Sequence, residues 1–167
     1  MDHDHFVRLF EAHFQRLVRY LDRLSGEPDL AADLAQETFV RLYARGAAPD
    51  SSAAWLITVA TNLFRNARAQ RSRRLRLLTP ERGESVLADP PPAPGQTTED
   101  AETRGRVRAA LDRLDERERQ LLLLRAEGYS YHDLALALDL NEASVGTLLA
   151  RAKRAFRAVY EGDHDAP

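Results

Sequence analysis

The chain has 167 residues, 30 % of them charged, and a formal net charge of −2, which is typical of a folded globular protein and argues against wholesale disorder. It contains no Cys, so disulfide scaffolds and cysteine-based metal sites are excluded. No apolar run is long enough to span a bilayer, and the acidic start MDHDH is unlike a signal peptide. We therefore expect a cytoplasmic protein that does not insert into membranes.

The first part of the chain carries apolar residues at helical spacing. One helix is predicted through Phe6, Leu9, Phe10, Phe14, Leu17, Val18 and Leu21. Pro28, which follows a Gly-Glu break, predicts the start of a second helix running to about Ala44. A third helix is expected over about 53–74, capped by Ser51 or Ser52. No stretch alternates convincingly with period two, so we predict an all-α fold.

A break in composition divides the chain. Residues 79–100 contain five Pro and five acidic residues, a composition that cannot hold an interior helix and predicts a linker. It separates two small helical modules, residues 1–78 and 101–161, and residues 162–167 form a tail. Modules of this size have marginal cores, so a bound partner would add to the stability of each.

The second module carries residues that are typical of helix starts and ends. Helices are expected over about 101–114, 116–127, 131–138 and 142–160. Asp115, Ser130 and Asn141 occupy N-cap positions, and Gly128 is placed to end the second of these helices. The last two helices are joined by only four or five residues, as in a helix-turn-helix.

The net charge conceals two basic clusters. Residues 65–76 hold six Arg and no acid, and residues 143–160 hold four basic residues and no acid. Of the 24 basic residues 23 are Arg, the side chain suited to bidentate phosphate contacts, although genome composition explains this bias equally well. The two clusters indicate a polyanionic partner.

The last predicted helix has two unlike faces. Its apolar stripe consists of Val145, Leu148, Leu149, Ala152, Phe156 and Val159. The opposite face consists of Ser144, Thr147, Arg151 and Arg154, flanked by Gly146, Ala150, Lys153 and Arg157. Small side chains allow close approach to a DNA groove, and the later cations can meet phosphates. The alternative is a surface helix whose late Arg residues complement the helix dipole.

The third helix has a similar division. A polar stripe consists of Thr58, Thr61, Asn62, Arg65 and Arg68. Hydroxyl and amide groups followed by Arg suit contact with a nucleic-acid strand. The Arg tract could equally be a solvated helix end, and Trp55, on the apolar face, is more often a core residue than a stacking platform.

The second helix carries more apolar groups than a three-helix module is expected to bury. Asp33, Gln36, Glu37 and Val40 share one stripe, and the other sides carry Leu34, Phe39, Leu42 and Tyr43. This surplus predicts a protein-protein interface with polar anchors. The alternative is internal packing with an ordinary acidic face.

Signals for catalysis are poor. The sequence has no phosphate-cradling glycine loop, no HExxH motif and no nucleophile elbow. Its five His residues are scattered, and His3 with His5 near the terminus would bind a metal only loosely. We expect no catalytic residues, no resident metal and no cofactor.

Taken together, these stretches resemble the extracytoplasmic-function (ECF) class of bacterial sigma factors. The segment that resembles the family's core-polymerase-binding region, with its D-L-x-Q-E-[TAV]-F hallmark, is DLAADLAQETFVRLY. The one that resembles the promoter-melting, minus-ten-reading helix is AAWLITVATNLFRNARAQRSRR. The one that resembles the minus-thirty-five-reading region runs from Leu111 to Phe156. The three occur in the family's order, and together they are specific.

The resemblance implies a role for each matching position. Core-polymerase binding falls to Asp33, Leu34, Gln36, Glu37 and Phe39, with Val40 on the same stripe. Minus-ten binding falls to Asn62, Arg65 and Arg68, beside Thr58 and Thr61. Minus-thirty-five binding falls to Ser144, Thr147, Ala150 and Arg151, with Lys153 and Arg154 adjacent. The implied partners are core RNA polymerase, promoter DNA and an anti-sigma factor.

Two other functions remain open. A helix-turn-helix repressor or activator, similar to quorum-type response regulators over residues 113–156, would bind duplex DNA without polymerase. A helical adaptor or anti-factor would bind only proteins. The helix that carries Asp33, Gln36 and Glu37 separates these hypotheses, because a plain repressor has no use for it.

Overall fold

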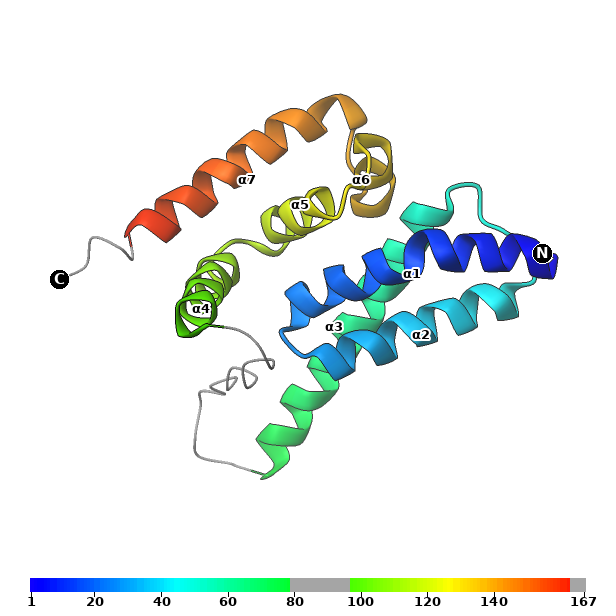
Figure 1. The fold of residues 1–167 in the computed structure, drawn as a ribbon, viewed down its shortest axis with the longest axis horizontal. Helices are drawn as coiled ribbons and strands as arrows, with labels where there is room; N and C mark the ends of the chain where they lie inside the picture. The colour runs from blue at the N-terminus through cyan, green and yellow to red at the C-terminus, as the bar shows by residue number, and fades with distance from the viewer. Residues whose placement is uncertain (79–96, 163–167) are drawn as a thin grey trace. The chain divides into compact units, whose positions relative to one another are not determined.

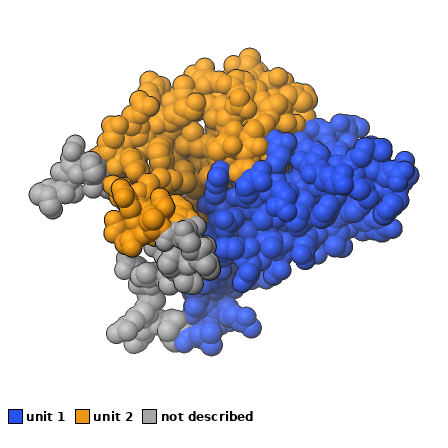
Figure 2. Space-filling model, viewed as in Figure 1, with its two compact units in different colours: residues 1–89 blue, residues 90–167 orange. Residues whose placement is uncertain are grey.

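A computed structural model of the protein describes residues 1–78 and 97–162. These residues form seven helices and no strands, in two compact units (Figures 1 and 2). The predicted all-α class with two helical modules is confirmed, whereas residues 79–96 of the predicted linker lie outside the described ranges. None of the described helices is long and apolar enough to cross a membrane.

The first unit is a three-helix assembly. Its helices are α1 (His3–Ser25), α2 (Pro28–Arg45) and α3 (Ser52–Leu78). A tight connection joins α1 to α2, where Gly26 adopts the left-handed conformation at φ 71° that favours glycine. The two helices pack side by side against α3 (Figure 1). The buried side chains include Leu17, Tyr20, Leu21, Leu24, Ala31, Leu42, Leu56, Ile57 and Ala60.

Local capping fixes where α1 and α3 begin. The Asp2 carboxylate accepts a 2.7 Å hydrogen bond from the His5 backbone N–H, and this bond lowers the pKa of Asp2 from its ordinary value. At α3, the Ser51 hydroxyl oxygen accepts a 3.4 Å hydrogen bond from the Ala54 N–H. Ser51 rather than Ser52 is therefore the capping residue.

Helix α3 continues four residues beyond its predicted end at Arg74. Every side chain from Arg68 to Leu78 is exposed, so this extension is not held by core packing. Arg, Leu, Gln and Ala have good helix propensity, which favours continuation without burial. One ion pair, Arg71 Nη1 to Glu27 Oε1 at 2.5 Å, links the exposed part of α3 just before this extension to the α1–α2 connection.

The second unit contains the four remaining helices. They are α4 (Thr98–Asp112), α5 (Glu116–Ala126), α6 (Tyr131–Leu138) and α7 (Glu142–Gly162). Helix α4 begins three residues before the predicted residue 101, because the Thr97 hydroxyl accepts a 3.2 Å hydrogen bond from the Asp100 N–H. The predicted linker boundary at residue 100 is therefore too late. The buried side chains include Leu121, Leu124, Tyr129, Leu134, Val145, Leu149 and Ala152.

A buried hydrogen bond joins α1 to α3 in the first unit. The Tyr20 phenol oxygen lies 3.1 Å from the Thr61 hydroxyl, and both side chains are buried. Thr61 was expected on the exposed polar stripe of α3, and this expectation is wrong. Thr61 follows buried Ala60 and lies four residues after buried Ile57, so it faces α1.

This bond predicts different effects of two Thr substitutions on stability. Thr61→Val keeps the side-chain shape but removes a partner of the buried Tyr20 hydroxyl, so the free energy of unfolding of unit 1 should fall by about 1 kcal/mol. Denaturant unfolding followed by the fluorescence of Trp55, the only Trp in the chain, reports this unit. The control is Thr58→Val, at an exposed site on the same helix, which should change stability by less than about 0.5 kcal/mol. Equal losses at both positions would contradict the assigned role of the buried bond.

Candidate nucleic-acid and protein interfaces

Helix α7 exposes to solvent the face that was predicted to contact DNA, which we call the front of α7. Each of the six predicted minus-thirty-five residues is exposed: Ser144, Thr147, Ala150, Arg151, Lys153 and Arg154. On the opposite side, Val145, Leu149 and Ala152 are buried, so the core holds α7 by one stripe only. The exposed front begins with small neutral side chains and becomes cationic from Arg151 onward, which suits a helix end that enters a groove.

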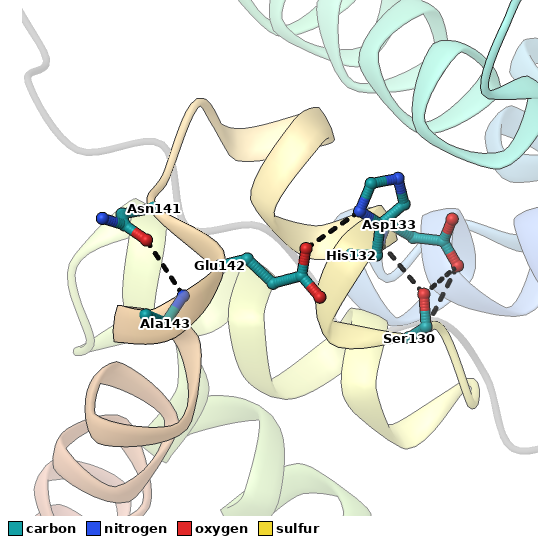
Figure 3. Close-up of polar contacts among 6 residues, drawn as sticks. All are labelled: Ser130, His132, Asp133, Asn141, Glu142 and Ala143. Atoms are coloured by element: carbon teal, nitrogen blue, oxygen red, sulfur yellow. Dashed lines mark hydrogen bonds and ion pairs between the residues drawn. The ribbon is translucent and has the colours of Figure 1, made fainter.

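Caps and a tight turn fix α7 against α6. The Ser130 and Asp133 side chains form a reciprocal capping box at the start of α6 (Figure 3). Asp139 then turns the chain in the left-handed conformation at φ 53°, and the Leu140 N–H donates to the Ala135 carbonyl at 2.8 Å. The Asn141 side-chain oxygen accepts a 3.0 Å bond from the Ala143 N–H, so α7 starts at a defined position.

Gly146 of α7 lies beside the Tyr131 ring of α6. A Cβ atom at Gly146 would lie 3.5 Å from the ring of Tyr131, which is ordinary van der Waals contact. The Arg125 guanidinium stands 5.6 Å from the centroid of the same ring, within cation–π range. The Arg125–Tyr131 contact therefore adds polar and aromatic groups beside the front of α7. Sequence spacing did not indicate this contact, because the two residues belong to different helices.

Helix α3 exposes four of its five predicted DNA-facing residues. Thr58, Asn62, Arg65 and Arg68 are exposed, while Thr61 is buried as described above. Arg65 Nη1 lies 3.5 Å from Asn62 Oδ1, so the two side chains are neighbours on one surface. The exposed stripe continues into the Arg-rich residues 71–76 of the same helix.

Trp55 lies at the start of α3 and is half-buried. The Arg45 guanidinium, from the end of α2, is 5.9 Å from the centroid of its ring. Trp55 is thus partly a packing residue, as its position on the apolar face predicted. The contact with Arg45 was not predicted, since it depends on the path of the loop that connects α2 to α3.

Helix α2 exposes a polar stripe with apolar neighbours. Asp33, Gln36 and Glu37 are exposed, Val40 is 60 % exposed, and Tyr43 is 65 % exposed. Glu37 Oε1 accepts a 2.8 Å hydrogen bond from Arg41 Nε, an exposed ion pair between successive turns. The surplus of apolar surface predicted for this helix consists of Val40 and Tyr43.

Two predicted contact residues of α2 belong instead to the core. Leu34 is 8 % exposed and Phe39 is 3 % exposed, so the expectation that they directly contact a partner is wrong for this structure. The Phe39 ring packs edge-on against rings of α1, with centroids 5.1 Å away for Phe10, 5.8 Å for Phe14 and 6.2 Å for Phe6. The aromatic residues of α1 therefore provide core contacts for Phe39 that the sequence of α2 alone did not indicate.

Metal-binding groups do not gather anywhere in the described part of the chain. No set of three or more His, Asp or Glu side chains there could hold a metal ion. The exposed surfaces on α2, α3 and α7 consist of amide, hydroxyl, carboxylate, apolar and guanidinium groups. Such groups suit binding to proteins and nucleic acids.

Family models match both units. Residues 9–74 match Sigma-70 region 2, and residues 104–156 match Sigma-70 region 4. The first match covers most of α1, all of α2 and most of α3. The second begins within α4 and ends within α7.

Relatives of known family match most of the chain. The ECF RNA polymerase sigma factor EcfG of Rhodopseudomonas palustris is 36 % identical over 137 residues, which are 79 % of this chain and 70 % of EcfG. The ECF RNA polymerase sigma factor SigE of Mycolicibacterium smegmatis is 32 % identical over 152 residues, which are 89 % of this chain. The chain spans only 59 % of the length of SigE.

A solved structure shares the fold. The sigma factor RpoE from Bartonella quintana, crystallised with the anti-sigma factor NepR, aligns with a TM-score of 0.69 at 22 % identity. The alignment covers 95 % of this chain and 98 % of that one. Both family models, the sequence relatives and this fold agree with the resemblance drawn from the motifs. The chain belongs to the ECF family of RNA polymerase sigma factors.

Proposed function

We propose that this chain is a dissociable specificity subunit that directs core RNA polymerase to particular promoters and carries out no chemistry of its own. The observation that carries the proposal is the exposure, on two separate compact units, of one surface suited to a protein and others suited to DNA. Residues 1–78 act as sigma region 2 and residues 101–161 as sigma region 4, the latter extended at its start by 98–100. The site of action is the cytoplasm.

The docking surface for core polymerase is the outer side of α2. Asp33, Gln36 and Glu37 provide polar anchors, and Val40 with Tyr43 provides apolar area that the unit leaves uncovered. Exposed aromatic residues next to directional polar groups are typical of interface centres. Leu34 and Phe39 support this surface from beneath, because both side chains are buried and Phe39 packs on aromatic rings of α1.

The opened minus-ten strand binds along α3. Asn62 offers an amide that can donate and accept hydrogen bonds at base edges. Arg65 and Arg68 follow at intervals of three residues on the same exposed side, where they can contact phosphates. Thr58 begins this stripe; Thr61 is not part of it.

The upstream minus-thirty-five duplex binds α7. The small front through Ser144, Thr147 and Ala150 lets the helix approach base edges. Arg151, at the end of that front, is the first long cationic side chain that can reach a base or a phosphate. Lys153 and Arg154 lie beyond it and contact the backbone.

An anti-sigma factor is the proposed regulator. RpoE, which shares the fold, was crystallised with its anti-sigma factor NepR. A protein that covers the α2 stripe or the α7 front would compete directly with polymerase or promoter, because both surfaces are exposed in this chain.

The decisive experiment asks whether the purified chain retains core RNA polymerase and then directs transcription from a promoter library. Retention followed by selective transcription supports the proposal. Duplex binding without retention of core would favour a helix-turn-helix repressor or activator. Binding to proteins alone, without either activity, would favour a helical adaptor.

Charge reversal on α2 tests the docking surface. Gln36→Lys with Glu37→Lys should abolish core retention, because it replaces two of the three polar anchors with cations at the interface. The fold should persist, since the Glu37–Arg41 pair is exposed on both sides and such pairs contribute less than about 1 kcal/mol. A matched control is Glu11→Lys with Gln15→Lys, the same residue types at exposed positions on α1. Unchanged core affinity in the α2 variant would count against the assigned interface.

Truncation of Arg151 tests the duplex contact. Arg151→Ala should weaken transcription that depends on the minus-thirty-five element, by about 1–3 kcal/mol if the guanidinium contacts a base. In-vitro transcription from promoters with and without that element measures the effect. Arg117→Ala, at an exposed position in the first turn of α5, is the control and should change neither. An equal loss on both promoter types would show that the assigned role is wrong.

A further inference from the structure

A hydrogen-bonded pair of side chains spans the turn between α6 and α7. His132 Nδ1, on α6, lies 2.9 Å from Glu142 Oε2, on the first residue of α7 (Figure 3). Both side chains are exposed, at 62 % and 57 % of their surface. An exposed pair of this kind adds little stability, so its position rather than its strength requires an explanation.

Glu142 is the one negatively charged residue near the start of α7, ahead of a neutral and then basic surface. After it, the sequence has no acid until Glu161. The exposed front that follows is small and neutral through Ala150, so Glu142 is the longest hydrogen-bonding side chain ahead of Arg151. A free carboxylate here would be repelled by DNA phosphates, whereas one directed at a base edge would meet a donor.

The polar side chains next to the pair are engaged elsewhere. The Asp133 carboxylate accepts hydrogen bonds from the N–H and the hydroxyl of Ser130 (Figure 3). The Asn141 side chain accepts from the Ala143 N–H. The capping groups of both helices are thus engaged with the backbone, and His132 and Glu142 meet each other across the turn.

The chemistry of the pair matches a way in which helix-turn-helix proteins read sequence. The first residues of the second helix contact base edges in the major groove, while the preceding helix crosses the backbone. A carboxylate accepts a hydrogen bond from the N4 amino group of cytosine and from no group on thymine. A side chain on the preceding helix can hold the reading group in place, and His132 is placed to do so.

We propose that Glu142 reads the amino group of a cytosine in the upstream duplex and that His132 is the positioning residue that holds its carboxylate. This inference rests on the proposed function, because it requires α7 to lie in the major groove. It adds a sequence-determining contact ahead of the small-residue front, at a residue not included among the predicted minus-thirty-five contacts.

The test is selection of duplexes from a random library by the full chain, alone at low salt and bound to core RNA polymerase. Among the duplexes that the wild-type chain selects, one position should be cytosine. Glu142→Gln should replace that cytosine by adenine, since an amide pairs with the N6 and N7 groups of adenine, and should weaken binding to the original duplex roughly tenfold. Preferences at other positions should remain.

Two control variants help to distinguish a base contact made by Glu142 from the positioning role of His132. Glu161→Gln makes the same charge change at the far end of α7 and should leave the cytosine preference intact. His132→Ala should relax that preference without creating a new one, whereas Leu136→Ala, which truncates another exposed side chain of α6, should not. Losses in the His132→Ala and Glu142→Gln double variant should be less than additive. Melting curves of each variant establish that it is folded.

The possible outcomes distinguish the two proposals. If the wild-type chain neither retains core polymerase nor selects a duplex, the proposed function fails, and this inference fails with it. If the wild-type chain selects duplexes but Glu142→Gln leaves the preference unchanged, or weakens all sequences equally, only the present inference is overturned. Glu142 would then serve to stabilise the positive end of the α7 dipole.

Discussion

Each unit must close a hydrophobic core from only three or four helices, and this constraint decides which side chains remain available to partners. A small unit buries a smaller share of its surface than a large one, so almost every apolar side chain that can face inward is needed there. In unit 1, Leu34 is buried, and Phe39 packs in the core against the Phe10 and Phe14 rings of α1. The exposed part of α2 is a polar stripe with Val40 and Tyr43 beside it, and this surface remains available to a partner.

Most of the fold could be predicted, because helical spacing and caps are local properties of the sequence. Asp115, Ser130 and Asn141 were predicted as N-cap residues. Each accepts a hydrogen bond from a backbone N–H at the start of its helix. The two errors in helix bounds lie at exposed helix ends, where burial does not mark the boundary. Thr97 starts α4 earlier than the Pro-rich composition suggested, and α3 runs on past its last buried side chain.

The candidate sites were predictable only as far as the face of each helix could be assigned. On α7 the core contacts one narrow stripe, so the opposite face is unambiguous and all six residues are exposed. On α3 the hydroxyls of Thr58 and Thr61 are chemically alike, but Thr58 is exposed, whereas Thr61 is buried and its hydroxyl lies 3.1 Å from the Tyr20 hydroxyl on α1. The His132–Glu142 pair and the contact of Arg45 with Trp55 join different helices, so no spacing rule within one helix could find them.

The distribution of charge explains how a chain with a net charge of −2 can hold a polyanion. At physiological salt, exposed charges are screened beyond about 8 Å, so a phosphate responds to nearby guanidinium groups and not to acids elsewhere. On α7 the cations begin at Arg151, after the small front, so in the proposed complex with DNA the turns that would meet base edges differ from those that would hold the backbone. Phosphate contacts supply affinity that falls with salt, and base contacts supply selectivity. Because the two are carried by different turns of one helix, substitutions in the front can change sequence preference while the later turns continue to hold the backbone.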